Sequence, residues 1–191
     1  MARIFYQQDC DLQKLAGKTV AIIGGGPGGL SAAYYLRLMG HEVTIFEQRK
    51  QFGGMLRYGI PRYRLPREVL QAEIDTILSL GIHTKTEVSV GENPSVMDLH
   101  RDYDAVYIAI GAHTDRKVGI EGEDATGVIS AVQMLRDIGD NRLPDFTGKR
   151  VVVIGGGNVA MDVTRSSVRL GAASVTCVYR RRIADMSALP D

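Results

Sequence analysis

The sequence predicts an α/β fold made of two βαβ units. Two segments are nearly the same, because residues 17–26 read GKTVAIIGGG and residues 148–157 read GKRVVVIGGG. In each copy an apolar run precedes the glycines, which is typical of a buried parallel strand. A helical stretch follows and stops at a glycine, Gly40 in the first copy and Gly171 in the second. Glycine suits the residue after a helix because that position needs a positive φ.

The remaining elements follow from apolar spacing and from the placement of glycine and proline. The predicted strands are 20–23, 42–46, 104–110, 151–154 and 174–179, with one or two short strands in 82–90. The predicted helices outside the two repeats are an amphipathic helix over 67–80 and a short helix over 130–138. A loop is predicted over 53–66, where glycine and proline are frequent.

The composition is that of a soluble globular protein. The 191 residues are 45% hydrophobic and 24% charged, and the formal net charge of +1 gives no field that would recruit nucleic acid or an anionic membrane. No apolar run approaches the roughly 20 residues of a membrane span, and residues 1–8 lack the apolar core of a signal peptide. We therefore expect a cytoplasmic protein.

The two cysteines, Cys10 and Cys177, are far apart in sequence and form no Cys-x-x-Cys motif. This excludes an iron–sulfur cluster or a structural zinc site built from this chain alone, and it leaves no redox-active pair of the usual spacing. We expect both cysteines to be reduced, with Cys177 a small buried residue of its strand. No metal site is predicted.

The first glycine turn has the spacing G-x-G-x-x-G between a strand and a helix, formed by Gly24, Gly26 and Gly29. Gly24 permits the tight turn, Gly26 lets a pyrophosphate approach the backbone, and Gly29 lets the helix pack closely on the strand. Pro27 fits the first helical turn, where its missing N–H costs nothing. The free N–H groups and the positive end of the helix would then face phosphates.

The acid at the end of the second strand, Glu47, discriminates between nucleotides. A carboxylate there accepts hydrogen bonds from an adenosine ribose 2′-OH and repels a 2′-phosphate, so this site favours FAD or NAD over NADP. The alternative is a solvated charge at a strand end. The loop 53–66 would run along a long ligand with Arg57 or Arg64 near its phosphates, although an ordinary surface loop with solvated arginines explains the same residues equally well.

Four motifs, in order along the chain, resemble the glutamate synthase small-subunit family. They are GGGPGGL at 24–30, FE at 46–47, GGMLRYGIP at 53–61 and AIGA at 109–112. That family includes the flavin part of dihydropyrimidine dehydrogenase and the larger subunit of NADH-dependent ferredoxin:NADP oxidoreductase. The resemblance covers nearly the whole chain from Gly17 onward, and it implies FAD at the first site with a backbone contact to adenine at Val88. The FAD contacts that the resemblance implies are Gly24, Gly26, Gly29, Glu47, Gly54, Leu56, Gly59, Ile60 and Gly111. The predicted FAD contacts also include the neighbouring residues Pro27, Gly28, Gln48, Met55, Ala109 and Ala112, together with Arg57 and Arg64 of the loop.

The second glycine turn differs from the first at two places. Ala160 replaces the third glycine, which the turn tolerates because that position needs only a small residue. After the second strand, Tyr179 replaces the acid, and Arg180–Arg182 follow. Guanidinium groups bind a 2′-phosphate bidentately, so this site favours NADPH over NADH, with a solvated basic turn as the alternative. The resemblance supports NADPH through its Val-Tyr-Arg-Arg match. The predicted contacts are Gly155, Gly156, Gly157, Asn158, Val159, Ala160, Tyr179, Arg180 and Arg181.

No side chain is predicted to act as acid, base or nucleophile, because hydride transfer is the chemistry of the cofactors. Asn158 is predicted to orient the pyrophosphate or nicotinamide end of the ligand, and Asp162 is interpreted as a charge favoured by the helix dipole. The four histidines belong to no motif and are interpreted as structural or solvated. They are His41, His83, His100 and His113.

These observations predict an FAD-dependent oxidoreductase that transfers hydride between NADPH and FAD. Glutathione-reductase-like and thioredoxin-reductase-like enzymes carry a cysteine pair that this sequence lacks, so a disulfide substrate is not expected. The resembling family passes electrons to iron–sulfur clusters, which implies an iron–sulfur protein or domain as the electron partner. The alternative is a non-catalytic nucleotide-binding scaffold.

The predicted domain division follows the two sites. Residues 1–16 are an N-terminal arm or linker, 17–112 an FAD-binding Rossmann-like domain, 113–148 the interdomain connection, and 149–191 the start of an NADPH-binding Rossmann domain. The second unit stops after its second strand, whereas a dinucleotide-binding half has the pattern βαβαβ. We therefore expect a fragment that is inactive alone, or a part of a larger chain or complex.

Overall fold

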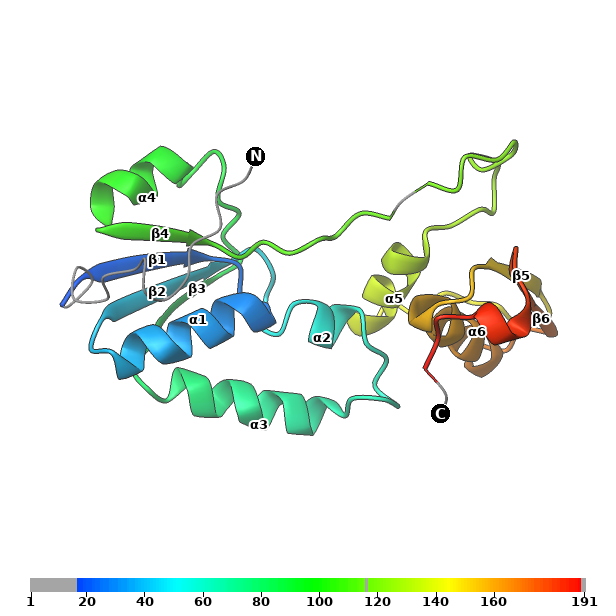
Figure 1. Ribbon diagram of the computed structural model, residues 1–191, viewed down its shortest axis with the longest axis horizontal. Helices are drawn as coiled ribbons and strands as arrows, with labels where there is room; N and C mark the ends of the chain where they lie inside the picture. Colours follow the sequence, from blue (N-terminus) through cyan, green and yellow to red (C-terminus); the bar gives the residue numbers. More distant parts are fainter. Residues whose placement is uncertain (1–16, 116, 190–191) are drawn as a thin grey trace. The chain divides into compact units, whose positions relative to one another are not determined.

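The computed structural model describes residues 17–115 and 117–189, so the predicted N-terminal arm and Cys10 lie outside the described residues. Strands and helices alternate along the chain (Figure 1), which confirms the α/β fold class. The strands are β1 (Thr19–Ile23), β2 (Glu42–Glu47), β3 (His83–Thr86), β4 (Ala105–Ile108), β5 (Arg150–Ile154) and β6 (Ser174–Val178). The helices are α1 (Pro27–Leu38), α2 (Met55–Tyr58), α3 (Arg67–Leu78), α4 (Val96–Asp102), α5 (Ala131–Gly139), α6 (Asn158–Arg169) and the short 3-10 helix η3 (Ile183–Asp185).

The chain forms two compact units that do not follow the order of the sequence. The first unit holds the described residues up to Gly54 together with Gln71–Gly111, and the second holds Met55–Leu70 together with the described residues from Ala112 onward. Residues 55–70 therefore belong to the second unit by their packing, although the sequence prediction placed them in the first domain. The division by cofactor remains a prediction.

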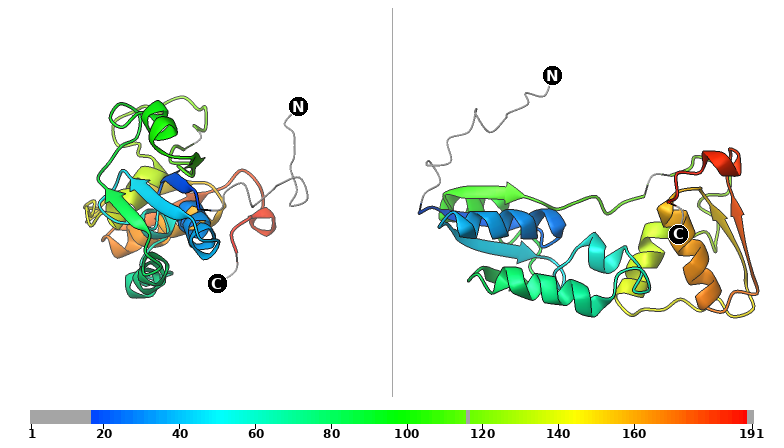
Figure 2. Two further views of the ribbon diagram at one scale, coloured as in Figure 1. Left: turned by 90° about the vertical axis from the view of Figure 1, so that its left-hand side faces the viewer. Right: turned by 60° about the horizontal axis from the view of Figure 1, so that its bottom comes forward.

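The first unit is a four-stranded parallel sheet in the order β3-β2-β1-β4. Ile22 of β1 pairs with Ile45 of β2 on one side and with Tyr107 of β4 on the other. Helices α1 and α3 lie on one side of this sheet and α4 lies on the other (Figures 1 and 2). Ile22 and Ile45 are fully buried, as parallel strands covered on both faces require.

The second unit pairs β5 with β6 in parallel, and α5 and α6 pack with the inner face of this pair. Its core contains Val153 of β5, Val163 of α6 and Leu135 of α5. The outer face is open to solvent, because Val152 of β5 and Val178 of β6 are about half exposed. The expectation that β5 is a buried strand is therefore correct for one face only.

Cys177 is exposed, so its predicted burial is wrong. Its strand β6 pairs with β5 alone among the described strands, which leaves an open edge beside Cys177. Its thiol lies 3.1 Å from the carbonyl oxygen of Gly155 in the second glycine turn.

Several local predictions hold, and two do not. Gly40 and Gly171 have φ values of +87° and +86°, as expected after α1 and α6. The predicted loop 53–66 contains the short helix α2, because the sequence MLRY lacks glycine and proline and is bounded by glycines that stop it. Helix α4 was not predicted. It begins at a capping box in which the Ser95 hydroxyl accepts from the backbone N–H of Asp98.

No helix among the described residues is both long and apolar enough to cross a membrane.

Candidate functional site

The first glycine turn lies where the strand order of the first sheet reverses. From β1 the chain continues to β2 and β3 on one side, and it then crosses back to β4 on the other side of β1. In open parallel sheets, ligands bind outside the carboxyl ends of the strands at this switch point. The turn follows directly after β1 and leads into α1, so it occupies this position.

The glycines of the first turn have different physical roles. Gly24 has φ +106°, and a Cβ there would clash with the carbonyl oxygen of Ala109. A Cβ on Gly29 would clash with the carbonyl oxygen of Gly24, so close packing of helix on strand requires glycine. Gly28 faces open space, because a Cβ there would meet nothing within 4 Å, whereas a Cβ on Gly26 would be in ordinary contact with the Cα of Gly54 at 3.6 Å. The open backbone at Gly28 fits a bound pyrophosphate.

The N-terminus of α1 is free to receive an anion. Gly26 is its N-cap and makes no side-chain capping bond, Pro27 occupies the first turn, and no acidic residue lies in that turn. A helix start without an internal cap leaves N–H groups for a ligand. The segment at Gly53 lies against this turn, because its N–H donates to the Gly25 carbonyl at 2.8 Å.

Glu47 is the last residue of β2 and is only 6% exposed. One carboxylate oxygen accepts from the N–H of Gly25 at 2.7 Å, and the other accepts from the N–H of Arg49 at 2.8 Å. The alternative of a solvated strand-end charge is therefore wrong. A carboxylate has about four acceptor sites, so two bonds leave capacity for ribose hydroxyls. The N–H of Val88 donates to the Glu47 carbonyl at 3.0 Å, which places Val88 beside this acid.

An aromatic ring packs against the second glycine turn, at the place where a carboxylate contacts the first turn. The N–H of Gly155 donates to the carbonyl of Val178 at 2.9 Å, which joins the turn to β6. A Cβ on Gly156 would lie 2.7 Å from the ring of Tyr179, so the ring packs directly on the turn. The Tyr179 hydroxyl donates to the carbonyl of Asp185 at 3.0 Å. Tyr179 therefore connects the glycine turn to η3.

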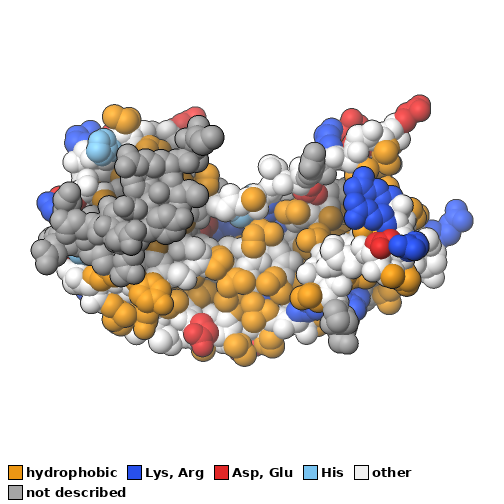
Figure 3. Space-filling model, in the orientation of Figure 1, with side chains coloured by type: hydrophobic (Ala, Val, Ile, Leu, Met, Phe, Trp, Pro, Cys, Tyr) orange, Lys and Arg blue, Asp and Glu red, His pale blue; other side chains and the backbone are white. Residues whose placement is uncertain are grey.

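The three arginines after β6 are exposed, and they differ in their partners. Arg182 pairs with Asp185, with Nε and Oδ2 separated by 3.2 Å. Among the residues that the structure describes, Arg180 and Arg181 have no ion-pair partner. Lys and Arg side chains gather on the surface at the end of the view where β5, β6 and η3 lie (Figure 3). Two guanidinium groups are thus available to an anion at the end of β6.

The residues that follow η3 return to the second glycine turn. The N–H of Ala188 donates to the Gly156 carbonyl at 3.1 Å, and the N–H of Leu189 donates to the side-chain oxygen of Asn158 at 2.8 Å. This bond uses the amide oxygen of Asn158 and leaves its NH₂ group as a donor. The α6 N-cap, Gly157, makes no side-chain capping bond, so this helix start also fits an anion.

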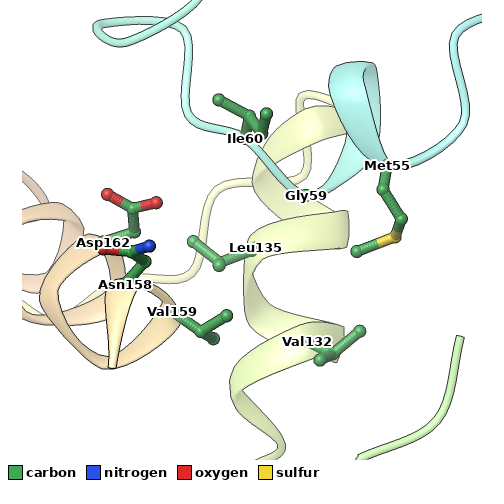
Figure 4. A pocket seen from close by; sticks show the side chains of 8 residues that line it. All are labelled: Met55, Gly59, Ile60, Val132, Leu135, Asn158, Val159 and Asp162. Carbon is green, nitrogen blue, oxygen red and sulfur yellow. The ribbon is translucent and has the colours of Figure 1, made fainter. Parts of the chain in front are cut away.

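A pocket of about 180 Å³ lies within the second unit, beside the start of α6 (Figure 4). Its walls come from α2 and the residues after it, from α5, and from the first two turns of α6. Most of them are apolar, and Asn158 and Asp162 are the polar members. The lining residues are Met55, Gly59, Ile60, Val132, Leu135, Asn158, Val159 and Asp162.

Asp162 is buried, at 7% exposure, and its carboxylate pairs with the guanidinium of Arg64. The Tyr63 hydroxyl also donates to the Asp162 carbonyl at 3.2 Å, and the guanidinium of Arg169 lies 4.0 Å from the centre of the Tyr63 ring. The interpretation of Asp162 as a charge placed only by the helix dipole is therefore incomplete, because this residue holds the segment 62–65 against α6. Whether Arg64 contacts a phosphate remains a prediction.

Arg67 shapes the segment that precedes it. Its guanidinium donates to the carbonyls of Ile60, Leu65 and Leu56 at 2.9, 3.2 and 3.3 Å. Burial lowers the pKa of the Arg67 guanidinium, and the nearby charge of Arg57 lowers it further. Sequence analysis missed Arg67 because nothing in the chain order indicates that one side chain binds three carbonyls of a loop.

The predicted FAD contacts are divided between the two units. The first unit brings together the glycine turn, Glu47, Gln48, Gly54, Val88, Ala109 and Gly111. The second unit contains Met55, Leu56, Arg57, Gly59, Ile60, Arg64 and Ala112, together with all the predicted NADPH contacts.

Of the histidines, His41 is buried, and His83 is exposed and lies 3.6 Å from Glu42.

Two uncapped helix starts, each after a glycine turn and a parallel strand, define a protein with two dinucleotide-binding turns. The chain belongs to the pyridine nucleotide-disulphide oxidoreductase family, whose model matches residues 18–189. It is thus an oxidoreductase by family, and the expectation of FAD and NADPH as cofactors is confirmed at the level of this family.

Named relatives agree with the motif resemblance. The chain is 51% identical over 175 residues to the NADP(+)-dependent formate dehydrogenase subunit beta of Moorella thermoacetica, which covers 91% of this chain and 25% of that protein. It is 40% identical over 186 residues to the glutamate synthase [NADPH] small chain of Escherichia coli K12, which covers 92% of this chain and 39% of that protein. The resemblance to the glutamate synthase small-subunit family is therefore confirmed, and the chain spans only a quarter to two fifths of the length of these relatives.

The solved structures include Mycobacterium tuberculosis FprA in complex with NADPH. The similarity has a TM-score of 0.77 at 27% sequence identity, and it covers 90% of this chain and 45% of that chain.

Proposed function

We propose that this chain binds FAD at the first glycine turn and NADPH at the second, and that hydride passes between the two cofactors. The observation that carries the proposal is the difference in charge at the ends of β2 and β6. A buried carboxylate, Glu47, lies at the first turn. Arg180 and Arg181, which are exposed and have no ion-pair partner among residues 17–115 and 117–189, follow the second. The first accepts from a ribose 2′-OH, and the second pair binds a 2′-phosphate.

In this proposal, the residues of the chain bind the two cofactors and orient them. The N–H groups at the start of α1 and of α6 hold the two pyrophosphates, Glu47 holds the FAD ribose, and the apolar pocket beside α6 excludes water from a bound ring. When bound, NADPH and FAD supply the hydride chemistry. No side chain is needed as acid, base or nucleophile.

We further propose that an iron–sulfur protein or domain exchanges electrons with the flavin, as part of a larger chain or complex. The sequence lacks the closely spaced cysteines that act on a disulfide substrate, since its two cysteines, Cys10 and Cys177, are far apart along the chain. Relatives by sequence include the NADPH-Fe(3+) oxidoreductase subunit beta of Geobacter sulfurreducens, 43% identical over 176 residues. Under this proposal the functional domains remain 17–112 and 149–191, joined by 113–148.

The double substitution Arg180→Ala with Arg181→Ala tests the second site. We expect the Kd for NADPH to rise by roughly tenfold to a hundredfold while the Kd for NADH is unchanged, because a charged hydrogen bond contributes about 1.5–3 kcal/mol and these groups are solvent-exposed. Fluorescence titration measures both constants. Arg142→Ala, which removes an exposed cation after α5, is the matched control and should change neither.

Equal losses for NADPH and NADH, or no loss, would contradict the phosphate assignment. A purified chain that stays colourless after incubation with FAD would favour the non-catalytic scaffold instead.

A further inference from the structure

We propose that the Arg64–Asp162 ion pair balances the charge of the pocket beside α6, and that this balance sets the relative affinity for oxidised and reduced nicotinamide. The inference rests on the proposed binding of NADPH at the second glycine turn. It concerns a property that this assignment alone does not fix, namely which redox form of the cofactor the site prefers.

The pocket lies within reach of the nicotinamide end of a dinucleotide. Asn158 and Val159 line the pocket and are the first residues of α6, directly after the glycine turn, and Asp162 follows one turn later (Figure 4). The adenosine 2′-phosphate is assigned to the end of β6. With its pyrophosphate at the start of α6, the dinucleotide has its other end free to enter the space that α2 and α5 line.

The walls of the pocket suit a flat ring. Val132 and Leu135 of α5 and Val159 of α6 present apolar side chains to it, and the NH₂ group of Asn158 is a donor for a carboxamide oxygen. Asp162 is the charged member of the lining.

The charge of Asp162 matters because the two redox forms of nicotinamide differ by one charge at the ring. The oxidised ring is a cation and the reduced ring is neutral. The Asp162 residue is 7% exposed, so solvent screens its carboxylate weakly. Its pairing with the guanidinium of Arg64 offsets that charge, so the wild-type pocket attracts the cation less than an unpaired carboxylate would.

The two halves of the pair therefore have opposite effects. Arg64→Gln leaves the carboxylate unbalanced and should tighten NADP⁺ relative to NADPH. Asp162→Asn removes the negative charge from the pocket lining and should weaken NADP⁺ relative to NADPH. For charges several ångströms apart at an effective dielectric constant near 20, and with a discount for partial exposure, we expect each ratio to change by about tenfold.

The experiment measures the Kd values of NADP⁺ and NADPH for the 191-residue chain by isothermal titration calorimetry at low ionic strength. Arg62→Gln is the matched control, because Arg62 belongs to the same segment but pairs with exposed Glu68 at 3.4 Å. The double variant Arg64→Gln with Asp162→Asn should return the ratio to the wild-type value.

A purely structural role for the pair would move the ratio of the two Kd values in the same direction in both single variants, or not at all. Either result in folded protein would overturn the proposal. If one single variant unfolds, the other single variant and the double variant still decide the sign. A wild-type chain that binds neither NADP⁺ nor NADPH would overturn the second-site assignment itself, which is a distinguishable failure.

Discussion

The two glycine turns share one backbone plan and differ in what stabilises them. In the first, a buried carboxylate accepts the N–H of Gly25 inside the turn. In the second, the ring of Tyr179 packs on Gly156, and the charged groups lie outside on an exposed surface. The repeated part of the sequence thus determines the backbone plan of each turn. The residues at the ends of β2 and β6, which the repeat does not share, determine the charge beside each turn.

The largest expected effect tests whether the two turns have equally close packing of helix on strand. Gly29→Ala should destabilise the fold by about 2–3 kcal/mol, because its Cβ would clash with the Gly24 carbonyl, whereas the second turn already carries Ala160 at this place. Gly28→Ala is the control. Its Cβ meets nothing within 4 Å, so a helical alanine should stabilise by about 0.5 kcal/mol.

Urea unfolding measures both variants of the first turn. If Gly29→Ala is as stable as Gly28→Ala, the first turn is as open as the second, and the comparison between them fails.

A smaller effect on stability is expected from substituting Glu47, the acid that is present at the first turn and absent from the second. Glu47→Leu removes the acceptor of the buried Gly25 N–H, so we expect a loss of about 2 kcal/mol in the free energy of unfolding and a loss of bound flavin. Glu47→Gln retains one acceptor and should keep most of the stability while binding flavin less tightly. Thermal unfolding and the ratio of flavin to protein absorbance report the two effects separately. Full flavin content in Glu47→Leu would contradict the role of Glu47 at the ribose.

The smallest effect concerns Asp104, which accepts hydrogen bonds from Thr19 at the start of β1. The backbone N–H of Thr19, then Lys18 and the Thr19 hydroxyl, lower the pKa of Asp104 from its ordinary value of 3.8 to about 2. Because the folded pKa is depressed, the stabilisation from Asp104 is present above pH 4 and is lost as the pH falls from 3.8 toward 2. Asp104→Asn should therefore be less stable than wild type at pH 7, and this difference should shrink over that range.

Urea unfolding between pH 7 and pH 2 measures this difference. A gap that stays constant with pH would show that the ionised carboxylate of Asp104 contributes nothing.

Sequence patterns predicted what local spacing controls. The glycine turns, the strands before them and the positive φ of Gly40 and Gly171 follow from neighbours along the chain. The Arg64–Asp162 pair and the Arg67 contacts join residues through tertiary packing, which no spacing rule indicates. The exposure of Cys177 was missed for a related reason, since the pattern of a strand does not say whether another strand pairs with its outer edge.

The hydrogen bond between Glu47 and Gly25 also bears on how long each cofactor stays bound. The carboxylate is already fixed in its bound direction before any ligand arrives, so little conformational freedom is lost when a ribose joins it. Arg180 and Arg181 must lose side-chain freedom each time they close on a phosphate. Under the proposed assignment, we therefore expect slower release of the cofactor at the first site than at the second.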